Sequence, residues 1–206
     1  MSNYKFHPIQ QEILYPASME KMDLIFSEVK EESFGQILSF EYPPLFTLGR
    51  SLKDKATLLP DGVPKFQTER GGLVTFHNPG QLVIYPILNL KNLNLGVKEF
   101  IFKMEESVLK SIADFSVEAF RKDACPGVFT EQGKLMSMGF RIKEGISTHG
   151  MAINVCNSLE DFQGLNLCSS KAASLDRISN YHPNIDTEEF YLVWQKNFLN
   201  EFTSKK

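Results

Sequence analysis

The chain has 206 residues, of which 42% are hydrophobic and 12% aromatic, and it carries a net charge of −3. This length can bury one substantial core, so we expect a single domain over residues 1–206. The acidic balance argues against a nucleic-acid-binding protein, which needs a basic face. Residues 1–15 show no apolar signal-peptide core, and the longest apolar run, Leu82–Leu88, is far too short to cross a bilayer. We therefore expect a cytoplasmic protein with neither nucleic acid nor membrane as a partner.

The first part of the chain predicts one helix and two extended segments. Apolar residues at helical spacing predict an amphipathic helix over residues 17–32. A strand at Gln36–Tyr42 follows, and after two prolines an extended segment resumes at Phe46–Arg50. Prolines and an Asp-Gly pair predict a loop over Ser51–Lys65.

The most informative stretch is Arg70–Tyr85. An arginine and two glycines lead into a β-branched run, a His-Asn-Pro-Gly-Gln turn follows, and a second apolar strand comes after it. This order predicts a hairpin-like unit with chemistry at its turn. Glycines let another group approach the backbone closely, while Arg70 and His77 add a fixed cation and a titratable group. The alternative is a tight hairpin with ordinary surface residues.

The second half predicts two more helices and several short strands. Apolar residues at intervals of four predict a helix over Gly96–Phe115, and a last helix is expected to begin at Asp186, whose side chain can cap its first turn. Between them, β-like segments lie at Val117–Phe120, Val128–Thr130, Leu135–Ile142 and Met151–Val155. The prediction is an α/β fold with a mixed sheet, several antiparallel neighbours and flanking helices.

Familiar catalytic motifs are missing. The sequence has no P-loop, no Gly-x-Gly-x-x-Gly, no Gly-x-Ser-x-Gly elbow and no His-Glu-x-x-His. Its three cysteines, Cys125, Cys156 and Cys168, form no Cys-x-x-Cys pair, so neither a disulfide framework nor a structural zinc site is indicated. We expect no metal ion and no cofactor. At least one cysteine could be a working thiol, although a free cysteine is more often a buried small hydrophobe.

Three later stretches carry candidate chemistry. Lys134 stands at the start of one predicted strand, His149 at the start of the next, and Cys168 lies in a polar loop. The ordinary interpretation of Lys134 is a solvated charge at a strand end, and that of His149 is a satisfied turn residue.

Together these stretches resemble the lipoyl/octanoyl transferases. The likeness runs from about Glu41 to Cys168 and centres on the string Arg-Gly-Gly-x-x-Thr-aromatic-His-x-Pro-Gly-Gln at residues 70–81. It is supported by the order of the segments that follow, which are Pro126-Gly127-Val128, Lys134-Leu135, Gly139-Phe140-Arg141-Ile142, His149-Gly150 and Asn154. The resemblance implies the α/β fold of the biotin and lipoate protein ligases.

The resemblance also implies a catalytic pair and an acyl-binding surface. Cys168 matches the family's acyl-thioester cysteine, and Lys134 matches the lysine that favours its thiolate. Cys125 is the rival thiol, but it precedes a segment where the family keeps no nucleophile, and Cys156 is expected to be packed. The acyl chain would lie against Arg70, Gly71, Gly72, Leu73, Val74, Thr75, Phe76, His77, Ser137, Met138, Gly139, His149, Gly150, Met151 and Ala152.

The chain departs from the family pattern in two places. Asn78 stands where the family usually has glycine, and asparagine is the residue that best replaces glycine in a left-handed backbone. Leu167-Cys168-Ser169 stands where the family usually reads Pro-Cys-Gly, which changes the loop but keeps the thiol.

The activity implied is transfer of an octanoyl or lipoyl group to a lysine, through a cysteine thioester and without ATP. The donor would be octanoyl-acyl carrier protein. The acceptors would be lipoyl domains of 2-oxoacid dehydrogenase complexes and the glycine cleavage H protein. Two alternatives remain at this point: an ATP-dependent lipoate or biotin protein ligase of the same fold, which needs no cysteine, and a non-catalytic acyl-binding protein.

Overall fold

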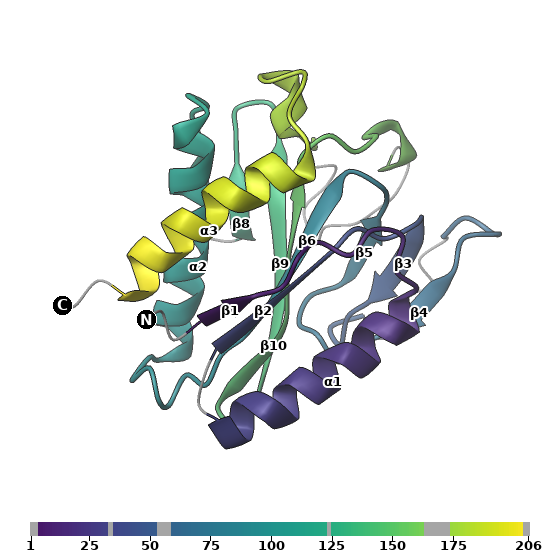
Figure 1. Cartoon of the computed structure of the whole chain (residues 1–206). Helices are drawn as coiled ribbons and strands as arrows, with labels where there is room; N and C mark the ends of the chain where they lie inside the picture. The colour runs from purple at the N-terminus through teal and green to yellow at the C-terminus, as the bar shows by residue number, and fades with distance from the viewer. Residues whose placement is uncertain (1–3, 33–34, 53–58, 123–124, 163–173, 204–206) are drawn as a thin grey trace.

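The computed structural model describes residues 4–32, 35–52, 59–122, 125–162 and 174–203 (Figure 1). In these residues it contains two β-sheets, three α-helices and two short 3-10 helices. The strands are β1 (Tyr4–Phe6), β2 (Gly35–Phe40), β3 (Leu45–Leu48), β4 (Lys65–Gln67), β5 (Val74–His77), β6 (Gln81–Ile87), β7 (Phe120–Lys122), β8 (Cys125–Phe129), β9 (Lys134–Lys143) and β10 (Ile146–Asn154). The α-helices are α1 (Tyr15–Glu32), α2 (Val97–Asp114) and α3 (Thr187–Thr203).

The larger sheet has seven strands in the order β1-β2-β6-β10-β9-β8-β7, and the smaller has three in the order β4-β3-β5. In the larger sheet β1 runs parallel to β2, and the other described neighbours are antiparallel. The predicted mixed sheet with antiparallel neighbours and flanking helices is thereby confirmed. Among the described helices, none is long and apolar enough to cross a bilayer.

Helices cover both faces of the larger sheet (Figure 1). Along β6, Leu82 and Ile84 pack with α2 and α3 in one core, whereas Val83 and Tyr85 pack with α1 in a second core on the opposite face. This alternation follows from the two-residue period of a strand. Every residue of β6 is buried, which explains why its sequence is an almost continuous apolar run.

The three predicted helices are confirmed, with small shifts at their ends. The first begins at Tyr15, slightly before the predicted residue 17, and the second spans Val97–Asp114. At the start of α3 the backbone N–H of Glu189 donates to Oδ1 of Asp186 at 2.8 Å. Asp186 is therefore the helix cap that the sequence predicted.

The predicted hairpin over Arg70–Tyr85 is wrong. Its two strands belong to different sheets, because β5 pairs with β3 and β6 pairs with β2 and β10. A strand buried along both faces, as β6 is, fits the middle of a large sheet, whereas β5 contributes Val74 and Phe76 to the separate core of the small sheet. The turn between them carries the chain from one sheet to the other.

Two further predictions needed adjustment. The predicted loop over Ser51–Lys65 includes residues 53–58, which lie outside the described residues, and its last residue begins β4. The predicted strand at Val117–Phe120 is displaced, since β7 starts only at Phe120. Val117 is instead buried in the core beneath α2.

Gly150 shows how closely β10 and β6 approach each other. A Cβ atom added there would lie 1.8 Å from the carbonyl oxygen of Ile84. We expect Gly150→Ala to lower the free energy of unfolding by about 3 kcal/mol, because two central strands must separate. Urea denaturation measures this loss. The matched control is Gly96→Ala, where an added Cβ meets no atom within 4 Å; an equal loss in both variants would contradict the prediction.

Candidate active site

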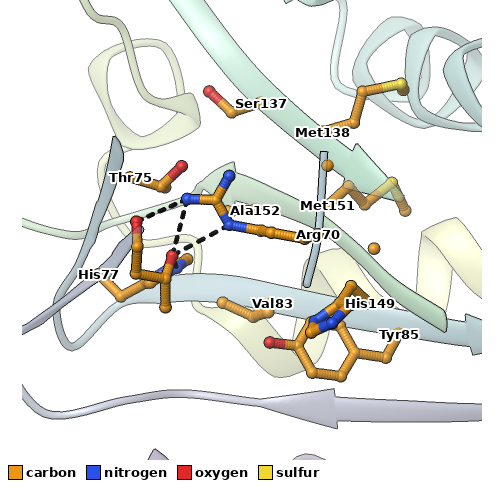
Figure 2. Close-up of a pocket in the computed structure, with 13 residues that line it drawn as sticks. Arg70, Thr75, His77, Val83, Tyr85, Ser137, Met138, His149, Met151 and Ala152 are labelled. Atoms are coloured by element: carbon orange, nitrogen blue, oxygen red, sulfur yellow. Dashed lines mark hydrogen bonds between the residues drawn. The ribbon is translucent and has the colours of Figure 1, made fainter. Parts of the chain in front are cut away.

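A narrow pocket lies where the two sheets meet, and it has an empty volume of about 340 Å³ including its open mouth (Figure 2). Ten residues predicted to contact an acyl chain line it, namely Arg70, Thr75, His77, Ser137, Met138, Gly139, His149, Gly150, Met151 and Ala152. Thr47, Val83 and Tyr85 also line it, and the sequence reasoning had not selected them. The pocket therefore joins residues of β3, β5, β6, β9 and β10.

The other predicted acyl-contact residues lie beside the pocket. Val74 and Phe76 pack in the core of the small sheet. Gly71 lines a separate surface hollow together with Phe140. Its N–H donates to the Phe140 carbonyl at 3.2 Å and so ties the Arg-Gly-Gly loop to β9. Gly72 has φ of +85°, a conformation that favours glycine, and the carbonyl of Leu73 accepts a bond from Arg70 at 3.0 Å.

Arg70 is buried and holds the pocket wall together. Its Nη2 donates to the carbonyl of Thr47 at 2.6 Å, its Nε donates to the Thr47 hydroxyl at 3.2 Å, and its Nη1 donates to the carbonyl of Gly71 at 2.8 Å. Figure 2 shows the side chain extended along the wall toward His77. Because its donors are committed to protein oxygens, the guanidinium shapes the Arg-Gly-Gly loop and ties it to β3.

His77 is fixed in one tautomer by its neighbours. Its Nδ1 lies 2.6 Å from Oε1 of Gln81, while the amide nitrogen of Gln81 donates to Asn154 at 2.9 Å. With an oxygen acceptor at Nδ1, that nitrogen carries the proton, and Nε2 accepts from the Thr47 hydroxyl at 3.2 Å. Burial lowers the pKa of His77 to about 4, so the ring is neutral near pH 7.

His149 differs from His77 in having an unsatisfied ring nitrogen. The residue is 4% exposed, and among the described residues its Nδ1 has no hydrogen-bond partner. Its backbone has φ of +55°, which is uncommon for a residue with a large side chain. Burial, together with Arg70 and Arg141, lowers the pKa of His149 to about 4. The interpretation of His149 as a satisfied turn residue is wrong for this ring.

Lys134 is buried at the start of β9, with only 6% of its surface exposed. Its Nζ lies 3.5 Å from Sγ of Cys125 and 5.4 Å from the centre of the Phe129 ring. The interpretation of Lys134 as a solvated charge is therefore wrong. Cys168, its predicted partner, lies outside the described residues, so their pairing stays a prediction.

Gly127 makes the room that the Lys134 side chain occupies. It has φ of +139°, and an added Cβ would lie 2.8 Å from Cε of Lys134. Its N–H donates to Oε1 of the buried Glu105 at 2.9 Å, and Oε2 of Glu105 accepts from Arg121 at 3.0 Å. The Pro-Gly-Val segment is thus anchored to α2 in a position that admits a long side chain from β9.

Two sequence expectations near the turn after β5 are corrected. Cys156 is exposed instead of packed, and its Sγ lies 3.8 Å from the carbonyl of Gly80. Asn78 is not among the described residues with positive φ, so it does not act as a substitute for glycine in a left-handed turn. Its side-chain nitrogen instead donates to the carbonyl of Ser158 at 2.9 Å and to the carboxylate of Asp161 at 2.8 Å.

The described residues include no group of three or more His, Cys, Asp or Glu side chains that could hold a metal ion. The structure shows a buried amine on β9, and the same strand contributes Ser137, Met138 and Gly139 to the pocket wall. A cationic amine near a thiol or a reacting carbonyl stabilises negative charge in either group.

Comparison with known proteins identifies clear relatives. The model of the lipoyl protein ligase A/B catalytic domain matches residues 15–199. An octanoyltransferase of Cellvibrio japonicus (strain Ueda107) is 34% identical over 169 residues, which cover 82% of this chain and 79% of the relative.

Solved structures share the fold at much lower identity. A lipoate-protein ligase A bound with ATP has a TM-score of 0.74 and 13% identity, covering 98% of this chain and 86% of that one. The apo biotin protein ligase of Aquifex aeolicus has a TM-score of 0.55 and 12% identity, covering 98% of this chain and 70% of that one. The predicted likeness to the fold of biotin and lipoate ligases is confirmed.

Proposed function

The chain belongs to the lipoyl protein ligase A/B catalytic domain family, as an acyltransferase related to the octanoyltransferases, and from this premise we propose that it transfers an octanoyl group from acyl carrier protein to a lysine of a lipoyl domain. The observation that carries the proposal is the buried amine of Lys134 on β9, the strand whose following residues Ser137, Met138 and Gly139 line the pocket. The same strand thus carries both the amine and part of the pocket wall.

The pocket suits a saturated chain better than a charged ligand. Its apolar wall residues can cover methylene groups, which favours transfer of an acyl chain out of water. The polar atoms of Arg70 and His77 are bonded to protein groups and so need no partner from the substrate. In this proposal the acyl chain lies against the pocket residues of β6, β9 and β10, which are neighbouring strands of the larger sheet.

In the proposed reaction, the thiolate of Cys168 attacks the carbonyl carbon of the octanoyl thioester on the carrier. The tetrahedral intermediate collapses, the bond to the carrier sulfur breaks, and the carrier leaves as a thiol after taking a proton from the Lys134 ammonium, which becomes a neutral amine. The acceptor lysine amine then attacks the new thioester, an amide forms, and Cys168 departs as thiolate while the amine loses a proton. The ammonium of Lys134 favours both thiolate and oxyanion, and its neutral form accepts the proton of the incoming amine.

The reaction requires no nucleotide. Exchange of one thioester for another is nearly balanced, and the final amide is more stable than either thioester. The proposed acceptors are lipoyl domains of 2-oxoacid dehydrogenase complexes and the glycine cleavage H protein. The proposed donor is octanoyl-acyl carrier protein.

Intact-mass analysis of the full chain mixed with octanoyl-carrier protein tests this function. We expect a covalent octanoyl adduct that disappears when a lipoyl domain is added, with the acyl group recovered on the domain. A parallel reaction with free octanoate and ATP is expected to release no pyrophosphate. Pyrophosphate release without an adduct would identify an ATP-dependent ligase, and binding of octanoate with neither product would identify an acyl-binding protein.

A further inference from the structure

Among the described residues, Nδ1 of His149 is a buried polar atom without a hydrogen-bond partner, on a side chain that lines the pocket. Only 4% of the surface of His149 is exposed, and no described residue forms a hydrogen bond with its Nδ1. Its ring packs edge-on against Tyr85, with 5.9 Å between ring centres (Figure 2). A buried polar atom left unpaired in a binding pocket costs free energy until a ligand or water satisfies it.

The backbone around His149 is also unfavourable for the residue. A φ of +55° is common for glycine but strained for a histidine side chain. Strain of this kind persists where surrounding contacts hold the residue in place. The backbone N–H of His149 donates to Sδ of Met22 on α1 at 3.3 Å, which holds this position of β10 against the helix.

The strand register places His149 at the end of the groove that is far from Lys134. Ala152 pairs with Ser137, Met151 with Met138, Gly150 with Gly139, and His149 with Phe140. From Ser137 to Phe140 the strand rises roughly 10 Å at about 3.3 Å per residue. An extended eight-carbon chain, with C–C bonds of about 1.5 Å, spans roughly 9 Å. A chain whose carbonyl lies on the Lys134 side therefore has its last carbons beside His149.

His149 is a neutral ring near pH 7, because burial lowers its pKa to about 4. A neutral imidazole offers one N–H donor and one nitrogen acceptor. A hydroxyl group can satisfy either of them, whereas a methyl group can satisfy neither.

We propose that His149 binds a hydrogen-bonding substituent on the distal carbons of the acyl chain, so that the enzyme accepts eight-carbon chains bearing a hydroxyl group there. The proposal rests on the proposed acyl transfer, since it assumes that the groove holds the acyl chain. His149 is then a specificity-determining residue at the end opposite the chemistry.

Calorimetric binding of two amide analogues tests the proposal without requiring catalysis. The probes are analogues of octanoyl-pantetheine and 8-hydroxyoctanoyl-pantetheine in which a stable amide replaces the thioester. In His149→Gly, we expect the affinity for the hydroxylated probe relative to the plain probe to fall about three- to tenfold, the value of one neutral hydrogen bond. Glycine is comfortable at the observed φ, so the variant is expected to fold.

Met151→Leu is the matched control, because it changes an apolar residue of the same groove at nearly constant volume. We expect the affinity ratio to stay within twofold in this variant. An unchanged ratio in His149→Gly, or failure of the unmodified protein to bind either probe, would overturn the proposal. The octanoyl adduct seen by mass spectrometry judges the transfer reaction separately.

A second measurement uses the unmodified protein, so it does not depend on whether a variant folds. Proton–nitrogen correlation spectra of the histidine rings are expected to show a larger shift of the His149 nitrogens with the hydroxylated probe than with the plain probe. Equal shifts with both probes would show that the ring does not bond the hydroxyl group.

Discussion

Cys168→Ala is expected to abolish both octanoyl transfer and the covalent adduct, with a loss of at least about 10³-fold in rate, because no other group in the proposed reaction takes the role of the nucleophile. Transfer to a lipoyl domain and intact mass after mixing with octanoyl-carrier protein measure the two losses. Since the substitution removes only a sulfur atom, we expect unfolding of the variant to occur near the temperature of the unmodified protein.

Cys125→Ala is the matched control, and the structure makes it a demanding one. Cys125 is the thiol seen next to Lys134, with 3.5 Å between Sγ and Nζ. We expect Cys125→Ala to keep both adduct and transfer, because the proposed mechanism places the acyl group on Cys168. Peptide mapping that places octanoyl on Cys125, or that finds none on Cys168 during turnover, would contradict the proposed mechanism.

Lys134→Met has the second large expected effect. Methionine fills much of the same buried space but carries neither a charge nor a proton-accepting amine, so we expect octanoyl transfer to fall by about 10²-fold or more. The rates of adduct formation and of transfer to the lipoyl domain, measured in single turnover, separate the two proposed roles of the amine. A fall in the second rate alone would restrict Lys134 to proton transfer.

Lys122→Met supplies the comparison for this prediction. Lys122 also lies over the Phe129 ring, with 4.5 Å between Nζ and the ring centre, but it is exposed on the edge strand β7. We expect this variant to transfer octanoyl at close to the unmodified rate. Equal losses in the two variants would mean that contacts of lysine with Phe129, and not the buried amine, matter for activity.

Local patterns predicted the elements well, and pairing between distant strands poorly. The spacing of apolar residues identified the three helices, and Asp186 identified where α3 begins. The hairpin prediction was wrong because the sequence of two neighbouring strands is the same whether they pair with each other or with strands elsewhere in the chain. No pattern within Arg70–Tyr85 indicates that β5 pairs with β3, or that β6 pairs with β2 and β10.

The pocket was predicted in part through the family motif. Tyr85 and Val83 were missed because they look like ordinary strand residues, yet their separation by two places them on one face of β6, which was a usable signal. The burial of Lys134 could not be predicted, since it depends on the space left by Gly127 on another strand. The lack of a hydrogen-bond partner for Nδ1 of His149 among the described residues could not be predicted either, because it depends on the positions of side chains from other elements.

The side-chain amide of Asn78 joins two parts of the chain that are distant in sequence. By donating to the carbonyl of Ser158 and the carboxylate of Asp161, it links the crossover between the two sheets to the segment that follows β10. A glycine at position 78 would offer no side chain for such a link. Shortening this side chain in Asn78→Ala would remove both hydrogen bonds, so the crossover between the two sheets and the segment after β10 would lose a direct link that involves no residue of the pocket.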